Sequence, residues 1–166
     1  EARGRASRIV VRARPGKPSE GLLCWGGHVF PCALGRGGIR AIKREGDGAT
    51  PAGRWRITGM LYRPDRLARP AGWAQEIAPG DLWSDDPADP DYNRMVKAPH
   101  GFSHEDLYRA DSLYDLVILT DWNADRVPGQ GSAIFIHEWA GPDSPTEGCI
   151  AFARPVLHML APALAP

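Results

Sequence analysis

One stretch of the chain carries the residue types of covalent acyl-transfer chemistry. An apolar run, residues 133–136, leads directly to His137, and Cys149 precedes a second apolar run, residues 150–152. Such runs are typical of buried β-strands, which would place an imidazole at the end of one strand and a thiol at the start of the next. A neutral histidine within hydrogen-bond reach of a cysteine can take its proton, and the thiolate that results is a strong nucleophile.

The residues just before Cys149 are suited to a tight turn. Gly148 lacks a Cβ atom, so the amides around Cys149 can approach a reacting carbonyl and form an oxyanion hole. We expect Thr146 to shape this turn and to donate a hydrogen bond into the site. A purely structural interpretation competes with this one, because free cysteines are often buried and a histidine near a strand end is often a satisfied polar group. Spacing alone leaves both interpretations open.

Two blocks of the sequence resemble the YkuD-type L,D-transpeptidases. GSAIFIH (131–137), followed by TEGCI (146–150), is similar to the family's strand-end histidine, variable loop and Ser/Thr-His-Gly-Cys motif. DGATPAG (47–53), followed by Trp55, is similar to the family's Asp-x-x-Thr-Pro-x-Gly-x-aromatic segment. The blocks occur in the family's order, and the resemblance is strongest over residues 34–154. It predicts that the DGATPAG segment is a scaffold near the active site.

The resemblance implies a specific reaction, with Cys149 as nucleophile and His137 as base. The thiolate would attack a peptidoglycan stem-peptide amide that follows an L-configured centre, form a thioester, and transfer the acyl group to an amine to make a cross-link. A backbone carbonyl would orient the imidazole, and no cofactor or metal is needed. Three features depart from the commonest family pattern: Glu147 replaces a histidine, the His-to-Cys loop is shorter, and Ala151 replaces the Arg or Asn often found two residues after the cysteine. All three leave nucleophile and base in place and bear on substrate specificity.

Partners and location follow from the same resemblance. Stem peptides would serve as acyl donor and acceptor, and carbapenem-type inhibitors would acylate the same thiol. The enzyme would act in the periplasm or elsewhere outside the cytoplasm, in cell-wall biogenesis and cell shape, although the printed sequence has no export signal. Charged stem peptides need polar handles. The candidates at loop or strand-end positions, each also compatible with a structural role, are Arg63, Asn93, His100, Tyr114 and Trp139.

Composition favours one globular domain over residues 1–166 without a nucleic-acid partner. Lys plus Arg and Asp plus Glu each total 20, so no overall basic field exists to attract nucleic acid. No apolar run approaches the roughly 20 residues that span a bilayer. Residues 1–7, rich in arginine, are predicted to form a flexible arm.

The fold class is predicted to be mainly β. The chain holds 16 prolines and 19 glycines in short clusters, which disfavour long helices and favour short strands joined by turns. We expect a mixed, twisted or β-sandwich-like sheet with one or two short helices. Residues 21–25 and 28–32 should form a hairpin, 113–120 a central strand, and 103–111 a short helix. A helix should also begin near Pro155.

Spacing in the sequence predicts two smaller features. The predicted hairpin would set Cys24 opposite Val29 and Cys32 opposite Gly21, which favours unpaired thiols over a disulfide. Residues 64–104 lack periodicity and predict a functional loop or lid, and their acidic run, residues 85–91, is interpreted as a solvated turn.

Three other functions compete with transpeptidation. Hydrolysis of the thioester by water would make the protein a cysteine peptidase. A zinc peptidase would use His100, His104, Asp111 and His137, although the glutamate of a His-Glu-x-x-His site is missing. A non-catalytic wall-binding domain would have no need for a nucleophilic thiol.

Overall fold

The computed structural model describes residues 8–166, so the predicted arm, residues 1–7, lies outside the described residues. The elements are β1 (Val10–Arg14), β2 (Lys17–Trp25), β3 (His28–Ala33), β4 (Ile39–Arg40), β5 (Thr50–Pro51), β6 (Ile57–Tyr62), β7 (Gln75–Glu76), β8 (Asp81–Ser84), β9 (Met95–Lys97), β10 (His104–Asp106), β11 (Leu116–Thr120), β12 (Phe135–Glu138), β13 (Ile150–Phe152), α1 (Arg154–Leu160) and the 3₁₀ helix η1 (Ala161–Ala163).

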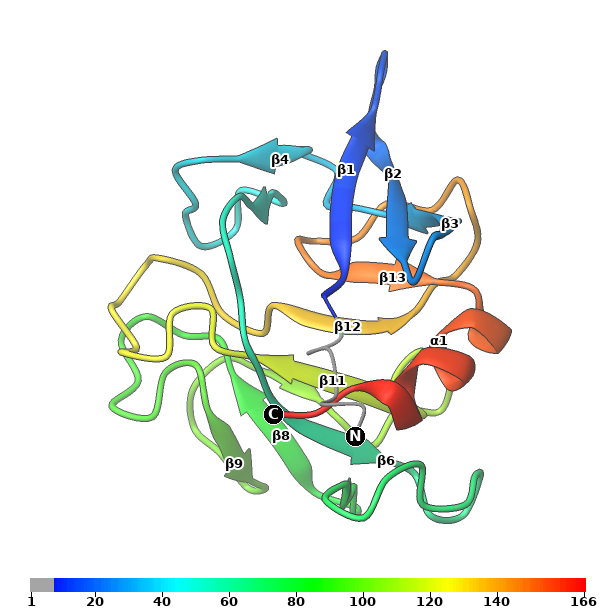
Figure 1. Cartoon of the computed structure of the whole chain (residues 1–166). Helices are drawn as coiled ribbons and strands as arrows, with labels where there is room; N and C mark the ends of the chain where they lie inside the picture. The colour runs from blue at the N-terminus through cyan, green and yellow to red at the C-terminus, as the bar shows by residue number, and fades with distance from the viewer. Residues whose placement is uncertain (1–7) are drawn as a thin grey trace.

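A mixed sheet forms the centre of the molecule (Figure 1). Over residues 8–166 its strand order is β1-β2-β3-β13-β12-β11-β6-β7. The pairs β12–β13 and β6–β7 are parallel, and the others are antiparallel. The prediction of a mainly β, mixed-sheet fold with short helices is therefore confirmed. None of the described helices has the length and apolarity needed to span a membrane.

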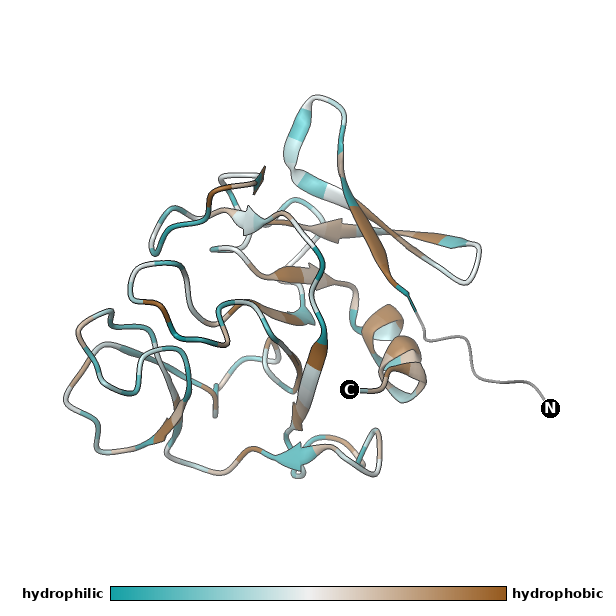
Figure 2. Cartoon of the chain, turned by 60° about the vertical axis from the view of Figure 1, so that its left-hand side comes forward, coloured by the Kyte–Doolittle hydropathy of each residue, from teal (hydrophilic) through white to brown (hydrophobic). Residues whose placement is uncertain are grey.

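Successive side chains of each strand point to opposite faces of this sheet. Each of the two faces is buried under a different layer. On β11, Leu116 and Ile118 join a core cluster that includes Leu157 and Leu160 of α1. Hydrophobic residues are correspondingly dense in α1 and the central strands, whereas the outer loops are largely hydrophilic (Figure 2). Helix α1 has Pro at its first turn, as predicted, where the missing N–H costs no hydrogen bond.

The opposite face is covered by a small sheet of order β10-β8-β9, whose strands lie between residues 81 and 106. Leu107, Val117 and Phe135 belong to the core cluster between the two sheets. The Trp83 ring of β8 meets the Phe135 ring edge-on at a centroid distance of 5.0 Å. The segment that appeared irregular in sequence thus forms a packed second layer.

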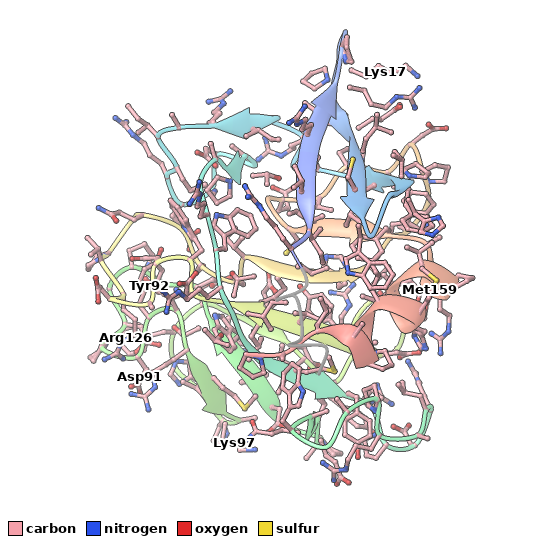
Figure 3. The ribbon with its side chains drawn as sticks, in the orientation of Figure 1. Lys17, Asp91, Tyr92, Lys97, Arg126 and Met159 are labelled. Atoms are coloured by element: carbon pink, nitrogen blue, oxygen red, sulfur yellow. The ribbon has the colours of Figure 1, made fainter. Side chains whose placement is uncertain are left out.

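The N-terminal hairpin has the predicted register. Cys24 pairs with Val29 and Cys32 with Gly21, and all three cysteines of the chain are free thiols. A second hairpin joins β1 to β2, and Figure 3 shows Lys17 at its projecting tip.

The predicted helix over residues 103–111 is wrong. The chain instead forms β10, in which Glu105 pairs with Trp83 of β8. Asp106 accepts a hydrogen bond from the Tyr108 amide at 2.9 Å, which makes a local turn instead of capping a helix. Pairing with β8 buries Leu107 completely, and this tertiary contact outweighs the weak capping signal.

Candidate active site

Parallel pairing of β12 and β13 places His137 and Cys149 on one face of the main sheet. Ile136 pairs with Ile150 and His137 with Ala151, and Cys149 immediately precedes β13. Since paired residues point to the same side and neighbours alternate, His137 and Cys149 share a face. Their relative exposures are 7% and 8%, so both groups are held in the layer between the two sheets.

The Cys149 thiol is held by backbone groups. Its Sγ atom donates to the carbonyl of Ala133 at 3.1 Å and accepts from the amide of Phe135 at 3.4 Å. Burial raises the pKa of Cys149 to about 12, and the nearby negative charge of Glu105 adds to the increase. The resting group is therefore a neutral thiol.

The His137 imidazole is oriented by its own neighbour's backbone. Its Nδ1 atom lies 2.6 Å from the carbonyl oxygen of Glu138. A carbonyl oxygen can only accept, so Nδ1 carries the proton and Nε2 is left as the base. Burial lowers the pKa of His137 to about 4, which keeps the ring neutral. Within residues 8–166 no hydrogen bond joins His137 to Cys149, so the thiol must turn from Ala133 toward Nε2 to be deprotonated.

Glu138 contributes its backbone, while its carboxylate is engaged elsewhere. Arg154 at the start of α1 donates to Oε2 at 3.0 Å, and the hydroxyl of Ser112 donates to Oε1 at 3.1 Å. These contacts fix the strand end that carries the carbonyl acceptor. The third group of the candidate triad is thus a backbone oxygen, as the resemblance implies.

Thr146 and Gly148 shape the turn that delivers the thiol. The Thr146 hydroxyl accepts from the Gly148 amide at 3.1 Å and donates to the Cys149 carbonyl at 2.6 Å. Gly148 has a φ of +143°, and a Cβ atom there would lie 2.8 Å from the carbonyl oxygen of Ala49. Both residues therefore support the turn. The Gly148 amide is occupied by Thr146 and does not point freely at an oxyanion position.

The DGATPAG segment, residues 47–53, supports this turn through hydrogen bonds. The Thr50 hydroxyl accepts from the Gly35 amide at 2.8 Å and donates to the Gly148 carbonyl at 2.9 Å. Asp47 accepts from the Ala49 amide at 2.8 Å and from the buried Lys43 ammonium at 2.5 Å. This segment is therefore a scaffold, and the hydrogen bond from Thr50 connects it to Gly148, the residue before Cys149.

Three of the five candidate substrate-binding residues have side chains that are engaged in contacts within the fold. Arg63 is 4% exposed, with its guanidinium paired to Asp65 at 2.8 Å. His100 lies 2.5 Å from the carboxylate of Asp89. Trp139 packs against the core cluster on the α1 side of the sheet. None of these arrangements presents a free polar group to the thiol.

The other two candidates lie close to the candidate pair. Asn93 accepts from the amide of Ala133, the residue whose carbonyl holds the thiol, at 3.0 Å and from the indole of Trp83 at 3.1 Å. Its neighbour Tyr92, labelled in Figure 3, accepts from the Gly131 amide at 3.0 Å. Asn93 therefore positions the strand entry. Tyr114 contacts the His137 ring directly, with centroids 5.2 Å apart.

A cleft of about 290 Å³ opens beside the thiol. Its lining includes Cys149 with the charged residues Lys43, Glu45, Asp85, Glu105 and Glu147.

Most of this lining is not predicted by the sequence. The acidic run predicts a solvated turn at Asp85, and Glu105 falls inside the predicted helix that does not form. The acidic run is not uniformly solvated, since Asp89 is 6% exposed and accepts from the Ser84 hydroxyl at 2.5 Å. Only the pairing of β8 with β10 brings Asp85 and Glu105 to the cleft, and no local signal predicted that pairing.

The structure does not bring together the residues that a zinc site would use. His100 is paired with Asp89, and its ring lies 6.0 Å from that of His104. His137 instead lies against Tyr114. In the part of the chain that the structure describes, no group of three or more His, Cys, Asp or Glu side chains is arranged to hold a metal ion.

Comparison with known proteins agrees with this fold. The family model described as the L,D-transpeptidase catalytic domain, YkuD, matches residues 24–166. The chain therefore belongs to the YkuD family of L,D-transpeptidase catalytic domains, and the predicted resemblance is confirmed. No curated protein and no solved structure matches the chain.

Proposed function

We propose that the protein is a peptidoglycan L,D-transpeptidase that uses Cys149 as its nucleophile and His137 as its base. The observation that carries the proposal is the placement of these two side chains on one buried sheet face, in a chain of this family. The Nδ1 contact to Glu138 leaves Nε2 of His137 as the basic atom. A non-catalytic binding domain would require neither the base nor the thiol.

The first half-reaction forms a thioester. His137 Nε2 takes the thiol proton as Sγ attacks the carbonyl carbon of a stem-peptide amide. The tetrahedral intermediate then breaks its C–N bond. The leaving amine of a D-amino acid takes the proton from His137, so the acyl group remains on Cys149 and the ring is neutral again.

The second half-reaction makes the cross-link. An amine of another stem peptide attacks the thioester carbon while His137 Nε2 takes one of its protons. The C–S bond breaks, and His137 returns the proton to the thiolate. If water attacks instead of the amine, the same steps release a carboxylate, and the enzyme acts as a peptidase. The ratio of these two products measures the balance between transfer and hydrolysis.

The buried, neutral resting state makes the first step dependent on substrate. A thiol with a pKa of about 12 and an imidazole with a pKa of about 4 do not form a resting ion pair. Proton transfer must therefore accompany attack. We expect low reactivity toward small thiol reagents, because the free enzyme holds almost no thiolate.

The experiment that tests this function is product analysis after incubation with a stem tetrapeptide. Wild-type protein should release a D-amino acid and produce a cross-linked dimer, both measured by mass spectrometry. The Cys149→Ala variant should produce neither. Cys24→Ala is the matched control, because it removes a half-buried thiol from the N-terminal hairpin. Dimer formation by Cys149→Ala would overturn the proposal.

The proposal extends to inhibitors and location. A carbapenem should acylate Cys149, since its strained ring carbonyl is attacked by the same nucleophile. The protein should work outside the cytoplasm, where stem peptides are cross-linked. Secretion of a reporter fused to the full natural protein tests the location, and a reporter retained inside the cell would contradict it.

A further inference from the structure

The cleft beside Cys149 carries more negative than positive charge. Its lining holds the four carboxylates Glu45, Asp85, Glu105 and Glu147 and one ammonium group, that of Lys43. The Lys43 ammonium is already paired with Asp47. Glu147 is paired with Arg36 at 3.1 Å, and Glu45 accepts from the Ser132 hydroxyl. Asp85 and Glu105 form no ion pair within residues 8–166.

Asp85 and Glu105 are held side by side by the small sheet. Glu105 pairs with Trp83, and the Asp85 amide donates to the Ser103 carbonyl at 3.2 Å. Since paired residues of antiparallel strands share a face, Asp85 and Glu105 are diagonal neighbours on the face that carries Trp83. Trp83 contacts Phe135, whose amide donates to Cys149. This geometry directs both carboxylates to the thiol side of the molecule.

One oxygen of this pair is buried without a partner. Asp85 Oδ1 is inaccessible to solvent and makes no hydrogen bond. A buried acceptor without a donor carries a desolvation cost, which a donor bound in the cleft would offset. Glu105 accepts from the Tyr114 hydroxyl at 2.8 Å, which fixes its carboxylate at the cleft. Burial, with repulsion from Asp85 and Glu45, raises the pKa of Glu105.

We propose that a primary ammonium group of the substrate binds between the carboxylates of Asp85 and Glu105, beside the Sγ atom of Cys149. This inference rests on the proposed function for the nature of the substrate, a stem peptide with a diamino acid. An ammonium group supplies several donors and one positive charge, which matches one unpartnered oxygen and two carboxylates that form no ion pair among the described residues. The bound cation also offsets the negative charge that disfavours the Cys149 thiolate. Binding of the correct substrate therefore favours formation of the thiolate that attacks it.

A binding experiment tests the inference without requiring turnover. In the Cys149→Ala background, calorimetry compares a stem tetrapeptide that has a free side-chain amine with the same peptide acetylated on that amine. The free peptide should bind about tenfold more tightly, the effect of one charge-assisted contact. Asp85→Asn and Glu105→Gln should each remove this advantage. Glu105→Gln retains an acceptor for Tyr114, and thermal unfolding confirms that each variant is folded.

Asp125→Asn is the matched control, because it removes one carboxylate from an exposed loop residue outside the cleft. It should leave the tenfold advantage unchanged. Equal affinity for the two peptides, or an advantage that survives both cleft substitutions, would overturn the inference. Formation of a carbapenem adduct on Cys149 is measured separately. A protein that lacks the adduct but prefers the free amine refutes the proposed function and retains the cation site.

Kinetics with the Cys149 enzyme assign the ammonium group to one of two sources. If acetylation of the donor slows release of the D-amino acid, the group belongs to the acyl donor. If release is unchanged, and Glu105→Gln diverts the thioester from cross-linking to hydrolysis, the group belongs to the acceptor, whose ammonium must lose one proton to solvent before it attacks as the neutral amine. Either result supports the site. A failure of both effects would contradict it even if the binding preference were present.

Discussion

The rings of Tyr114 and His137 form a T-shaped contact, with a centroid distance of 5.2 Å and an angle of 73° between the planes. The same tyrosine donates its hydroxyl to Glu105 in the cleft. Tyr114 therefore links the candidate base to the carboxylates beside the thiol. The imidazole packs against this ring, and Nδ1 is held by Glu138, so two contacts restrict rotation of the base.

Two substitutions should distinguish the role of the Tyr114 ring from that of its hydroxyl. Tyr114→Phe keeps the ring and should leave acylation of Cys149 within about threefold of wild type. Tyr114→Leu removes the edge contact, on the order of 1 kcal/mol, and should lower acylation about tenfold. Adduct formation followed over time by mass spectrometry measures both. Equal losses in the two variants would show that the hydroxyl, and not the ring, matters for the base.

Thr50→Val should uncouple the DGATPAG segment from the active-site turn. Valine has the same shape but leaves the Gly35 amide and the Gly148 carbonyl without their partner. Each unsatisfied buried group costs about 1–3 kcal/mol, so we expect a loss of at least 2 kcal/mol in the free energy of unfolding, measured by urea denaturation. Thr58→Val, at an exposed position on β6, should change stability by less than about 0.5 kcal/mol. A similar effect of both changes would contradict the assigned role of Thr50.

Gly148→Ala should damage the turn that carries the nucleophile. Its φ of +143° disfavours any side chain, and the added Cβ would lie 2.8 Å from the Ala49 carbonyl oxygen. We expect destabilisation of about 1–3 kcal/mol and a loss of carbapenem adduct formation. Gly101→Ala meets no atom within 4 Å and should be tolerated. Normal acylation by Gly148→Ala would mean that the turn adapts without moving the thiol.

The low pKa of His137 predicts how stability depends on pH. The pKa is about 4 in the folded protein against an ordinary value of 6.5, so the unfolded chain binds more protons between these values. The contribution is fully present above pH 6.5 and is lost as the pH falls toward 4, with a magnitude on the order of 3 kcal/mol.

Urea unfolding of wild type and His137→Gln across this range isolates the histidine. The variant should lose less stability on acidification than wild type. His28→Gln replaces an exposed histidine and should follow the wild-type curve. Parallel curves for wild type and His137→Gln would show that the ring titrates normally and is not buried as a neutral base.

The strands and the candidate pair were predictable because their signals are local. The apolar runs that end at His137 and begin after Cys149 are contiguous. The register of the N-terminal hairpin follows from the two glycines, Gly26 and Gly27, that separate its strands. Asp85 and Glu105 were not predictable, since they meet only through long-range pairing of β8 with β10. The same pairing replaced the expected helix. Tertiary contacts of this kind leave no period in the sequence.

The most direct test of the central claim is the intact mass of the protein after incubation with a carbapenem. Wild type and the controls Cys24→Ala and Cys32→Ala should each gain the mass of one inhibitor molecule, and Cys149→Ala should gain none. That result would establish Cys149 as the acylated nucleophile. A folded wild-type protein without an adduct, or an adduct that persists in Cys149→Ala, would contradict the account.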